Sequence, residues 1–500
     1  MEQATMTEKI NLNSAIGGLN LIDPIDNMGS EYAIQMDNII PDSDGDRIRS
    51  GYVSCVEGAY KTLIPVPFAG NQKIIACKDE TVDIYDPTDW ETEPTSTSGF
   101  STDNWTYSVF TDGSGTQYLF MANGVDTPQV YTTANGLADA GYTIPEGVKL
   151  DSPLSFKNTM YFVGGDWDIY YGGTQAISGS LTKFSVGSFF KKGGKILTIQ
   201  NWTQDAGQGM DDIFVIISTE GEVMLYRGTN PTESDWSTLG VFVIPRPIGK
   251  HCCEMFGADV IILTENGYLP LSSVLSDLRA NRTAISGKIN TIVKGKDFTE
   301  KWEIHFYSKR GWLFINAPSN LAGYAHEQHV LNINTNAWCR FVGMDADSWC
   351  VLFDKLYFCN GKGIFQADEG TTDNGGWITY EIQRAYNTFG TPEKKQIMRL
   401  VPRFNSFYKD NNIYKRINVD FKQGQNRVIQ TQDNVGYSSY WDTSVWDVNY
   451  WSDEYEAYTT RAGVKSKAGS FISIGVYGRT KNDLCFTSAG LMIKVCQGHI

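Results

Sequence analysis

An apolar strand, a tight turn and a second apolar strand follow one another in Phe214-Val-Ile-Ile-Ser-Thr-Glu-Gly-Glu-Val-Met-Leu-Tyr226. The same order recurs in Leu356-Tyr-Phe-Cys-Asn-Gly-Lys-Gly-Ile-Phe365. Asn-Gly and Glu-Gly turns between apolar runs are a strong short-range signal for a β-hairpin. Related segments begin at Ile74, Tyr118, Met160, Val260 and Leu313. The chain therefore contains a recurring strand–turn–strand unit.

The spacing of these units predicts the fold. From residue 74 the copies begin at 118, 160, 214, 260, 313 and 356, with gaps of 42 to 54 residues. A repeat of about 40–50 residues with about four short strands is typical of a β-propeller blade. We predict an all-β chain with under about a tenth of its residues in helix, built as a β-propeller. The alternative is an all-β protein with irregularly spaced hairpins. The copies lack the Gly-His and Trp-Asp pairs of WD40 repeats.

The chain divides into three predicted parts. Residues 1–52 form an N-terminal arm and a lead-in strand, with residues 1–10 flexible and the rest tying the N-terminus to the first blade. Residues 53–372 form the β-propeller. Residues 373–500 form a C-terminal β-sandwich-like module, a candidate donor of the strand that closes the ring.

One segment within the repeats has helical spacing. After Pro270 the apolar residues recur at intervals of three and four, at positions 271, 274, 275 and 278. Ser272 or Ser273 is the N-cap candidate, and Asp277 and Arg279 would lie on the polar side. The helix either packs on its own blade or forms a contact surface.

Acidic residues are concentrated at one end of the chain. Residues 1–150 hold 22 acids against 7 bases and so carry the whole net charge of −15, while residues 151–500 hold 35 of each. This argues against a general nucleic-acid-binding surface. The acids either keep the protein soluble or repel a polyanion from a channel wall. A basic stretch at 381–430, with 10 bases and 4 acids, could contact phosphates or be a solvated face.

The sequence also indicates the compartment in which the protein is made. No apolar run approaches the 18 residues of a membrane span, and the polar N-terminus does not resemble a secretory signal. We therefore expect synthesis in a cytoplasm. The nine cysteines form no C-x-x-C pair, so we expect free, buried thiols.

No catalytic or metal-binding motif stands out. The carboxylates of Asp42, Asp44 and Asp46 alternate as in a calcium loop, but the Gly and Glu that an EF-hand needs are missing from their places. His326 and His329 are three residues apart, in what we expect to be a loop entering a strand rather than a metal site. We predict no metal, no cofactor and no catalytic residue. A pair of glycosidase carboxylates remains an alternative.

Two sets of residues resemble a known family. Gly18-Leu-Asn20, Ala33…Asn38 and Arg49-Ser-Gly51 precede the strand array in that order. The pattern resembles the start of tail-nozzle and packaged-DNA stabilisation proteins of short-tailed bacteriophages. Gly267-Tyr-Leu-Pro-Leu-Ser272 followed by Ile285-Ser-Gly-Lys-Ile289 resembles their mid-chain pattern, and the terminal strands resemble their closing module.

The resemblance implies a structural virion protein without catalytic residues. Such proteins form a ring, usually of six copies, below the portal-adaptor ring. The ring continues the DNA channel and helps retain packaged DNA. The implied partners are further copies of the chain, the portal-adaptor ring, tail fibre, spike or needle proteins, and double-stranded DNA that passes without sequence recognition. The implied location is the phage tail, after synthesis in the host cytoplasm. The alternatives are a carbohydrate-active or sugar-binding propeller and an interaction scaffold.

If the chain forms a DNA conduit, some of its acids should face the lumen. Strand acids such as Asp83 are less free to choose a face than loop acids. The predicted channel-facing residues are therefore loop acids in turn-rich stretches: Asp42, Asp44, Asp46, Asp79, Glu80, Glu91 and Glu93.

Overall fold

The computed structural model describes residues 7–205, 210–276, 284–406, 412–422, 427–429, 456–459, 462–463 and 466–496. Contacts divide the chain into two compact units. Unit 1 comprises Met1–Val53, His329–Gly343 and Ala367–Ile500, and unit 2 comprises Ser54–Gln328 and Met344–Gln366. The N-terminal stretch therefore belongs to the same unit as the C-terminal part. We describe each unit separately.

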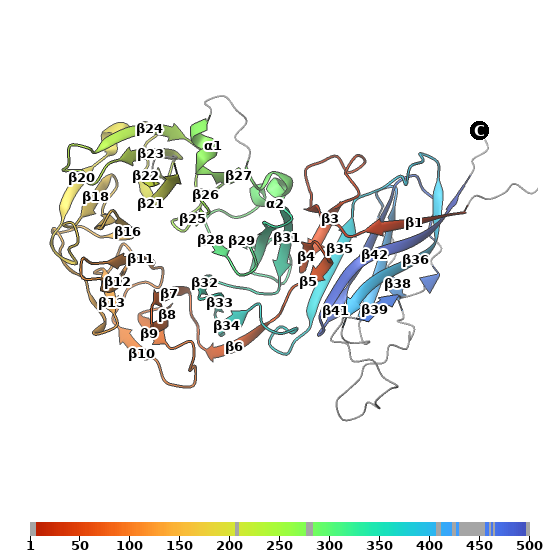
Figure 1. The fold of residues 1–500 in the computed structure, drawn as a ribbon, viewed down its shortest axis with the longest axis horizontal. Coiled ribbons are helices and arrows are strands. Elements are labelled where there is room, and N and C mark those ends of the chain that lie inside the picture. The colour runs from red at the N-terminus through yellow and green to blue at the C-terminus, as the bar shows by residue number, and fades with distance from the viewer. Residues whose placement is uncertain are drawn as a thin grey trace, which may run out of the picture. The chain divides into compact units, whose positions relative to one another are not determined.

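Seven blade-like sheets make up the described part of unit 2 (Figure 1). The first four sheets have four strands each. In chain order they contain β7 (Thr62–Phe68), β8 (Asn71–Lys78), β9 (Thr81–Tyr85) and β10 (Thr95–Ser98); β11 (Thr106–Thr111), β12 (Gln117–Ala122), β13 (Gln129–Thr132) and β14 (Gly136–Asp139); β16 (Asp151–Phe156), β17 (Thr159–Val163), β18 (Asp168–Tyr171) and β20 (Thr182–Ser185); and β21 (Ile196–Asp205), β22 (Met210–Ser218), β23 (Glu222–Arg227) and β24 (Ser237–Val243).

The remaining three sheets are less regular. The fifth has three strands, and the sixth begins in unit 2 and continues through β30, along which the chain passes into unit 1. The strands are β25 (Cys253–Phe256), β26 (Asp259–Thr264) and β27 (Gly267–Pro270); β28 (Glu303–Tyr307), β29 (Trp312–Pro318) and β30 (His326–Asn332); and β32 (Ser348–Leu352), β33 (Lys355–Asn360), β34 (Gly363–Ala367) and β6 (Tyr52–Glu57). A separate parallel pair joins β15 (Gly141–Thr143) to β19 (Ser178–Ser180).

The hairpin repeat in the sequence corresponds to these sheets one for one. The seven copies, which begin at 74, 118, 160, 214, 260, 313 and 356, fall in β8, β12, β17, β22, β26, β29 and β33, the second strand of each sheet. The widest gap, from 160 to 214, contains β19, a 3-10 helix (Gly187–Phe189) and the long strand β21. The prediction of an all-β β-propeller is confirmed.

The first strands of the sheets face the centre of the ring (Figure 1). Neighbouring first strands lie next to each other from β11 to β16 to β21 and from β25 to β28 to β32, and β32 lies next to β7. The ring is closed by β6, which pairs with β34 in the last sheet. The expected tie to the first blade, and closure by a C-terminal strand, were therefore wrong. A strand from before the first blade completes the last sheet and joins the two ends of the ring.

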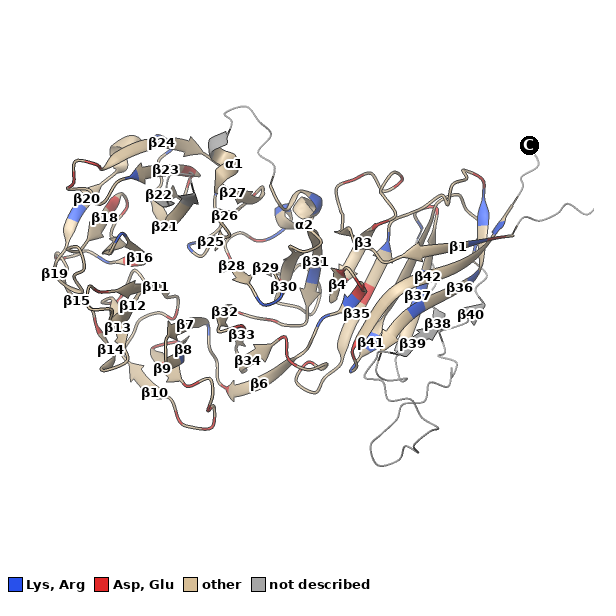
Figure 2. Ribbon diagram, viewed as in Figure 1, with Lys and Arg blue, Asp and Glu red and all other residues tan. Residues whose placement is uncertain are grey.

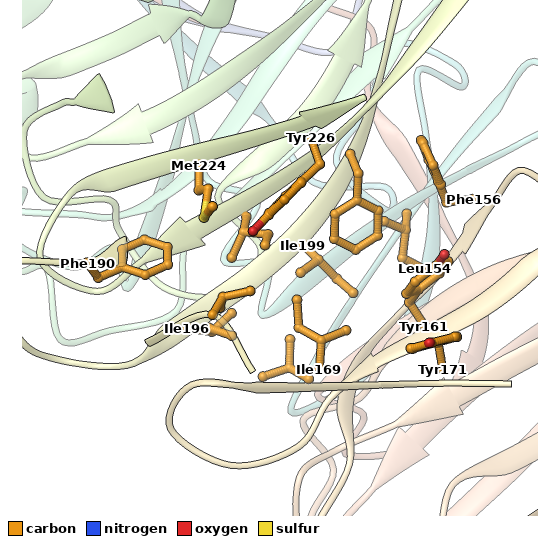
Figure 3. Close-up of a cluster of buried hydrophobic side chains, with 14 residues drawn as sticks. Leu154, Phe156, Tyr161, Ile169, Tyr171, Phe190, Ile196, Ile199, Met224 and Tyr226 are labelled. Carbon is orange, nitrogen blue, oxygen red and sulfur yellow. The ribbon is translucent and has the colours of Figure 1, made fainter. Parts of the chain in front are cut away.

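Hydrophobic clusters fill the spaces between consecutive sheets. Figure 3 shows the cluster in which Phe156 and Tyr161 of the third sheet meet Met224 and Tyr226 of the fourth. Similar clusters join the first sheet to the second, the second to the third and the seventh to the first. The first, second and third sheets thus bury both faces against their neighbours, which a lone hairpin cannot do.

Helices are few among the described residues. The predicted helix is confirmed as α1 (Leu271–Ser276), but it begins at Leu271, so the prediction of Ser272 or Ser273 as N-cap was wrong; Asp277 and Arg279 lie outside the described residues. Its start is held by Asp259, whose Oδ1 accepts from the Ser272 N–H at 3.0 Å. The others are α2 (Asn290–Lys294) and the 3-10 helices Gly187–Phe189 and Gly287–Ile289. This agrees with the predicted low helix content.

Unit 1 contains two larger sheets. One has the order β39-β36-β42-β5-β4, with β1 added to β42 and β40 to β36, and the other includes β2-β3-β35-β41-β37-β38, with β31 beside β2. The strands are β1 (Thr7–Asn13), β2 (Gly18–Leu19), β3 (Tyr32–Asp37), β4 (Ile39–Asp42), β5 (Gly45–Ile48), β31 (Ala337–Val342), β35 (Ile378–Arg384), β36 (Lys395–Ser406), β37 (Asn412–Val419), β38 (Arg427–Ile429), β39 (Glu456–Thr459), β40 (Ala462–Gly463), β41 (Ile472–Thr480) and β42 (Leu484–Val495).

The two sheets of unit 1 share a hydrophobic cluster. Leu400 of β36 and Leu491 of β42 pack with Ile417 of β37 and Ile474 of β41. The β-sandwich-like module nevertheless stays a prediction, because much of 423–465 lies outside the described residues. The expected flexible arm is wrong for residues 7–10, because β1 pairs antiparallel with β42.

Candidate functional site

The seven predicted channel acids do not form one site. Residues 1–53 of unit 1 hold 9 acids and 3 bases, while residues 54–150 of unit 2 hold 13 acids and 4 bases. The acidic excess is therefore divided between the two units, and Figure 2 shows where its members lie on the ribbon. Three predicted residues belong to unit 1 and four to unit 2: Asp42, Asp44 and Asp46, and Asp79, Glu80, Glu91 and Glu93.

The unit 1 acids lie on the β4–β5 hairpin, where Asp42 pairs with Gly45. Asp44 is exposed and Asp42 is half-buried. Asp46 is only 3% exposed, and both of its carboxylate oxygens accept from the Ala15 N–H, at 2.9 and 3.0 Å. Burial raises the pKa of Asp46 to about 6, although Arg384 and the Ala15 N–H act in the opposite direction. Asp46 is therefore enclosed by the fold and cannot face an open channel, which corrects that part of the prediction.

The unit 2 acids lie at opposite ends of one strand. Asp79 and Glu80 form the turn between β8 and β9, and Glu91 and Glu93 lie in the loop from β9 to β10. All four are exposed. The loop is anchored by Trp90, whose ring lies 5.5 Å from that of Tyr85 and 5.9 Å from that of Tyr357, centroid to centroid. An anchored loop presents its acids in a defined position.

The first strands of unit 2 carry a group of polar side chains that no sequence motif indicated. Glu303 of β28 accepts from Lys301 Nζ at 2.7 Å and from the hydroxyl of Ser348 in β32 at 2.9 Å. It also accepts from the Trp349 N–H at 2.8 Å. Burial acts to raise the pKa of Glu303, but Lys301, His305 and His251 hold it well below its usual range. With both oxygens occupied, Glu303 joins the sixth sheet to the seventh.

Glu254 of β25 has a different environment. Its half-buried carboxyl has no hydrogen-bond or ion-pair partner among the described residues. Burial raises its pKa to about 7, with His305 acting against the shift. Tyr107 of β11 is 39% exposed, yet protein surrounds its hydroxyl closely enough to raise its pKa, and the charges of Glu254 and Glu303 add to that effect. Side chains from several sheets therefore converge on the centre of the ring.

This central group could exchange a proton near neutral pH. Glu254 and Glu303 both act on Tyr107, and their environments shift their pKa values in opposite directions, a pattern that general acid–base sites use. The sequence signal that could have found it is the pair of first-strand segments Cys253-Glu-Met-Phe256 and Glu303-Ile-His-Phe-Tyr307, which place charged residues where a buried strand is expected.

The histidines and cysteines of the described residues are placed as follows. No group of three or more His, Cys, Asp or Glu suited to a metal occurs in the described ranges. His326 and His329 both lie in β30, where a separation of three places their side chains on opposite faces. All nine cysteines are free thiols, and six are buried.

No helix within the described part of the chain is long and apolar enough to cross a membrane.

The N-terminal residues of the phage-like pattern form a buried polar network in unit 1. Arg49 forms a bidentate ion pair with Asp373, with both N···O distances 2.7 Å, and its Nε donates to Asn38 Oδ1 at 2.9 Å. Asn38 has φ of 56° and donates from Nδ2 to the carbonyls of Val342 and Thr379, at 3.0 and 2.7 Å. The network joins segments about 300 residues apart in the chain.

The glycines of the same pattern lie where a side chain cannot fit. A Cβ on Gly18, whose φ is 71°, would lie 2.5 Å from the carbonyl oxygen of Trp338. A Cβ on Gly51 would lie 1.9 Å from that of Thr372. Asn20 is fully buried. The N-terminal pattern thus consists of residues that the fold of unit 1 requires.

The mid-chain pattern is structural too. Its two halves meet in unit 2: the Tyr268 N–H donates to Ser286 Oγ at 2.9 Å, and the Ile285 N–H donates to the Tyr268 carbonyl at 2.9 Å. A Cβ on Gly267 would lie 2.5 Å from Asn290 Oδ1 and 2.6 Å from Ser286 Oγ. The residues of this pattern therefore lie where β27 packs closely against the start of α2.

Comparison with known proteins adds little about function. No protein-family model matches the chain, and no curated protein matches it. Among solved structures it is similar to one titled "Crystal structure of BBS1N in complex with ARL6DN, soaked with lead". The identity is 11% and the TM-score 0.42, over 65% of this chain and 99% of that one. A similarity at this level carries no argument about partners or activity.

Proposed function

We propose that this chain is a structural subunit of a bacteriophage tail nozzle or hub, a ring that continues the DNA channel and helps retain packaged DNA. One observation carries the proposal. Both segments that resemble nozzle proteins coincide with positions where this fold permits little else, namely the Arg49–Asp373–Asn38 network and the contact of Gly267 with Ser286. The resemblance therefore concerns residues that maintain the fold. This is what we expect between structural proteins that share no catalytic residues.

The proposed channel is the lumen of a ring of copies. Tyr107, Glu254 and Glu303 converge on the centre of the propeller, which is therefore not the proposed DNA path. Of the predicted acids, Asp42, Asp44, Asp79 and Glu80 are proposed to face the lumen, whereas Glu91 and Glu93, at the opposite end of β9 from Asp79 and Glu80, are not. Like charge keeps DNA from adhering to a wall, and the effect falls off over roughly 8 Å at physiological salt. The portal-adaptor ring and the fibre, spike or needle proteins are the proposed neighbours.

The mass of the purified full-length chain tests the proposal. Native mass spectrometry with light scattering should give closed assemblies of one size, with six copies expected. A species that remains a 55.8 kDa monomer at micromolar concentration would contradict the proposal.

A carbohydrate-active or sugar-binding propeller is the second candidate. It is favoured by Glu254 at the centre of the ring, which has no hydrogen-bond or ion-pair partner among the described residues. In that case Glu254 would be the proton donor. Incubation with a polysaccharide panel should then release reducing ends, and Glu254→Gln should abolish the release while leaving the unfolding temperature unchanged. The structural proposal predicts no release by either protein.

A further inference from the structure

One sheet face of unit 1 is basic, and its bases have no carboxylate partner among the described residues. In the paired strands β1, β42 and β36, the rows Lys9–Met492–Arg399 and Asn11–Gly490–Val401 run straight across the sheet. The row Ile10–Leu491–Leu400 between them points into the hydrophobic cluster. Because side chains alternate along a strand, the first two rows share the opposite face. We call this the basic face: Lys9, Arg399, Arg403 and Lys494, around Gly490.

The basic face carries charge without acidic partners. Glu8 is the one acid in β1, β36 and β42, and it lies in the row of Ile493, on the buried side. None of the four bases is paired with a carboxylate in the described structure; Arg403 Nη1 makes only a long bond of 3.4 Å to Asn11 Oδ1. Figure 2 shows basic positions on β1 and β36. Four uncompensated cations on one sheet face predict an anionic partner.

The face is also hollowed. Gly490 has no side chain, so the sheet carries a shallow depression of about 300 Å³ bordered by Lys9, Arg399, Arg403 and Met492. Both Lys9 and Arg403 are exposed. A depression with a small apolar floor and a cationic rim suits a projecting loop with carboxylates on either side.

The same chain carries the complementary surface. Residues 79–148, which span the first two sheets from the β8–β9 turn onward, contain twelve acids and no lysine or arginine. Within them, the loop from β9 to β10 carries Asp89, Glu91 and Glu93, all exposed, and is anchored by Trp90. Glu91 and Glu93 form no side-chain hydrogen bond or ion pair among the described contacts, so their charges are free for a partner.

We propose that the basic face of one copy receives the β9–β10 loop of the next copy. A ring built by rotation needs a heterologous interface, in which two different patches of one chain match each other. Each copy carries one basic face and one β9–β10 loop, so every copy in a ring can receive one loop and supply another. The electrostatic contact fixes register and speeds association, while the rest of the 1,200–2,000 Å² of a typical stable interface comes from surrounding surface. This inference rests on the proposed ring.

Charge swapping tests it. The face-reversed variant is Arg399→Glu with Arg403→Glu, and the loop-reversed variant is Glu91→Lys with Glu93→Lys. Each variant alone should raise the protein concentration needed for assembly at least tenfold, because like charges then meet. Light scattering and native mass spectrometry measure this concentration. An equimolar mixture of the two should assemble as alternating copies, and one chain carrying all four changes should assemble as the unchanged protein does. Lys355→Glu with Lys362→Glu, exposed positions in unit 2, is the matched control and should assemble normally.

The outcomes separate the inference from the proposed function. Normal rings from the face-reversed variant would overturn the inference and leave the nozzle proposal standing. An unchanged protein that never assembles would overturn both. Duplex DNA is the alternative occupant: if face reversal removes DNA binding but leaves assembly intact, the basic face binds phosphate and the inference is wrong. If the face-reversed variant fails to fold, the loop-reversed variant alone decides, because its changes lie in unit 2; normal assembly by it contradicts the proposal.

Discussion

The two units of this chain are stabilised in different ways. Unit 2 repeats one local hairpin seven times and buries the faces of its sheets in apolar clusters such as that of Figure 3. Unit 1 joins three separate stretches of chain and fixes them with buried polar groups, including Arg49 with Asp373 and Arg340 with Asp37. Unit 2 also has buried ion pairs and unit 1 a hydrophobic cluster, but in unit 2 the burial repeats between neighbouring sheets, whereas in unit 1 the ion pairs join segments about 300 residues apart.

The largest effect is expected in the polar network of unit 1. Arg49→Met should lower the free energy of unfolding by about 3–5 kcal/mol, because it leaves the Asp373 carboxylate without its partner in a buried site. Arg47→Met is the control: its pair with Asp483 is more exposed, so its loss should cost at most about 1 kcal/mol. Urea denaturation measures both. If both variants lose the same small amount of unfolding free energy, unit 1 does not depend on the buried pair of Arg49 and Asp373.

The corresponding test in unit 2 is a cavity. Met224→Ala in β23 should lower the free energy of unfolding by about 2–5 kcal/mol, because Met224 is fully buried between the third and fourth sheets. Leu239→Ala in the adjacent strand β24, where the side chain is 41% exposed, should change it by less than about 0.5 kcal/mol. If the two variants unfold at the same urea concentration, the cluster between the sheets is not what stabilises the ring.

A pH dependence separates the buried acid of unit 1 from the exposed ones. The pKa of Asp46 rises from 3.8 to about 6 on folding, so the folded state holds a proton that the unfolded state has lost. This contribution to stability is present below about pH 4 and is lost as the pH rises to about 6 and above. Asp46→Asn should therefore stabilise the protein at pH 7, by about 1–3 kcal/mol, and flatten the profile.

The control for that profile is Asp44→Asn, since Asp44 is exposed in the same hairpin and should leave the pH dependence unchanged. Thermal unfolding between pH 4 and pH 8 measures the effect. A protein that becomes more stable from pH 4 to pH 6, and loses stability at pH 7 on Asp46→Asn, would contradict the assignment.

The smallest effect on stability, within about 0.5 kcal/mol, is expected for surface charge. Asp44→Lys in unit 1 and Glu80→Lys in unit 2 test which unit lines the proposed channel. The variant that places a cation on the wall should slow DNA release from assembled particles, because phosphates adhere to it. Release at the normal rate in both variants would favour the rival explanation, that these acids keep the protein soluble.

The difference between the units also explains what the sequence could reveal. The hairpins of unit 2 are local, so the turns at Asn360-Gly361 and Glu220-Gly221 predicted both the fold and the positions of the second strands. Nothing local indicates that Asn38 bonds to Val342, or that β6 pairs with β34. The closing strand and the polar network depend on contacts across some 300 residues, which a single sequence does not record.

The candidate site was harder to predict for the same reason. Loop position correctly indicated exposure for Asp79, Glu80, Glu91 and Glu93, but not for Asp46, whose carboxylate is enclosed by a segment 31 residues earlier. The central group of Glu254, Glu303 and Tyr107 is drawn from different sheets, so its members are far apart in the sequence and share no motif.

Electron cryomicroscopy of the purified, assembled full-length chain tests the central claim most directly. The account predicts a closed ring of copies around a lumen wide enough for duplex DNA, with Asp79 or Asp44 on its wall and the β9–β10 loop of each copy against the basic face of the next. Single particles whose only opening is the centre of one propeller would contradict it.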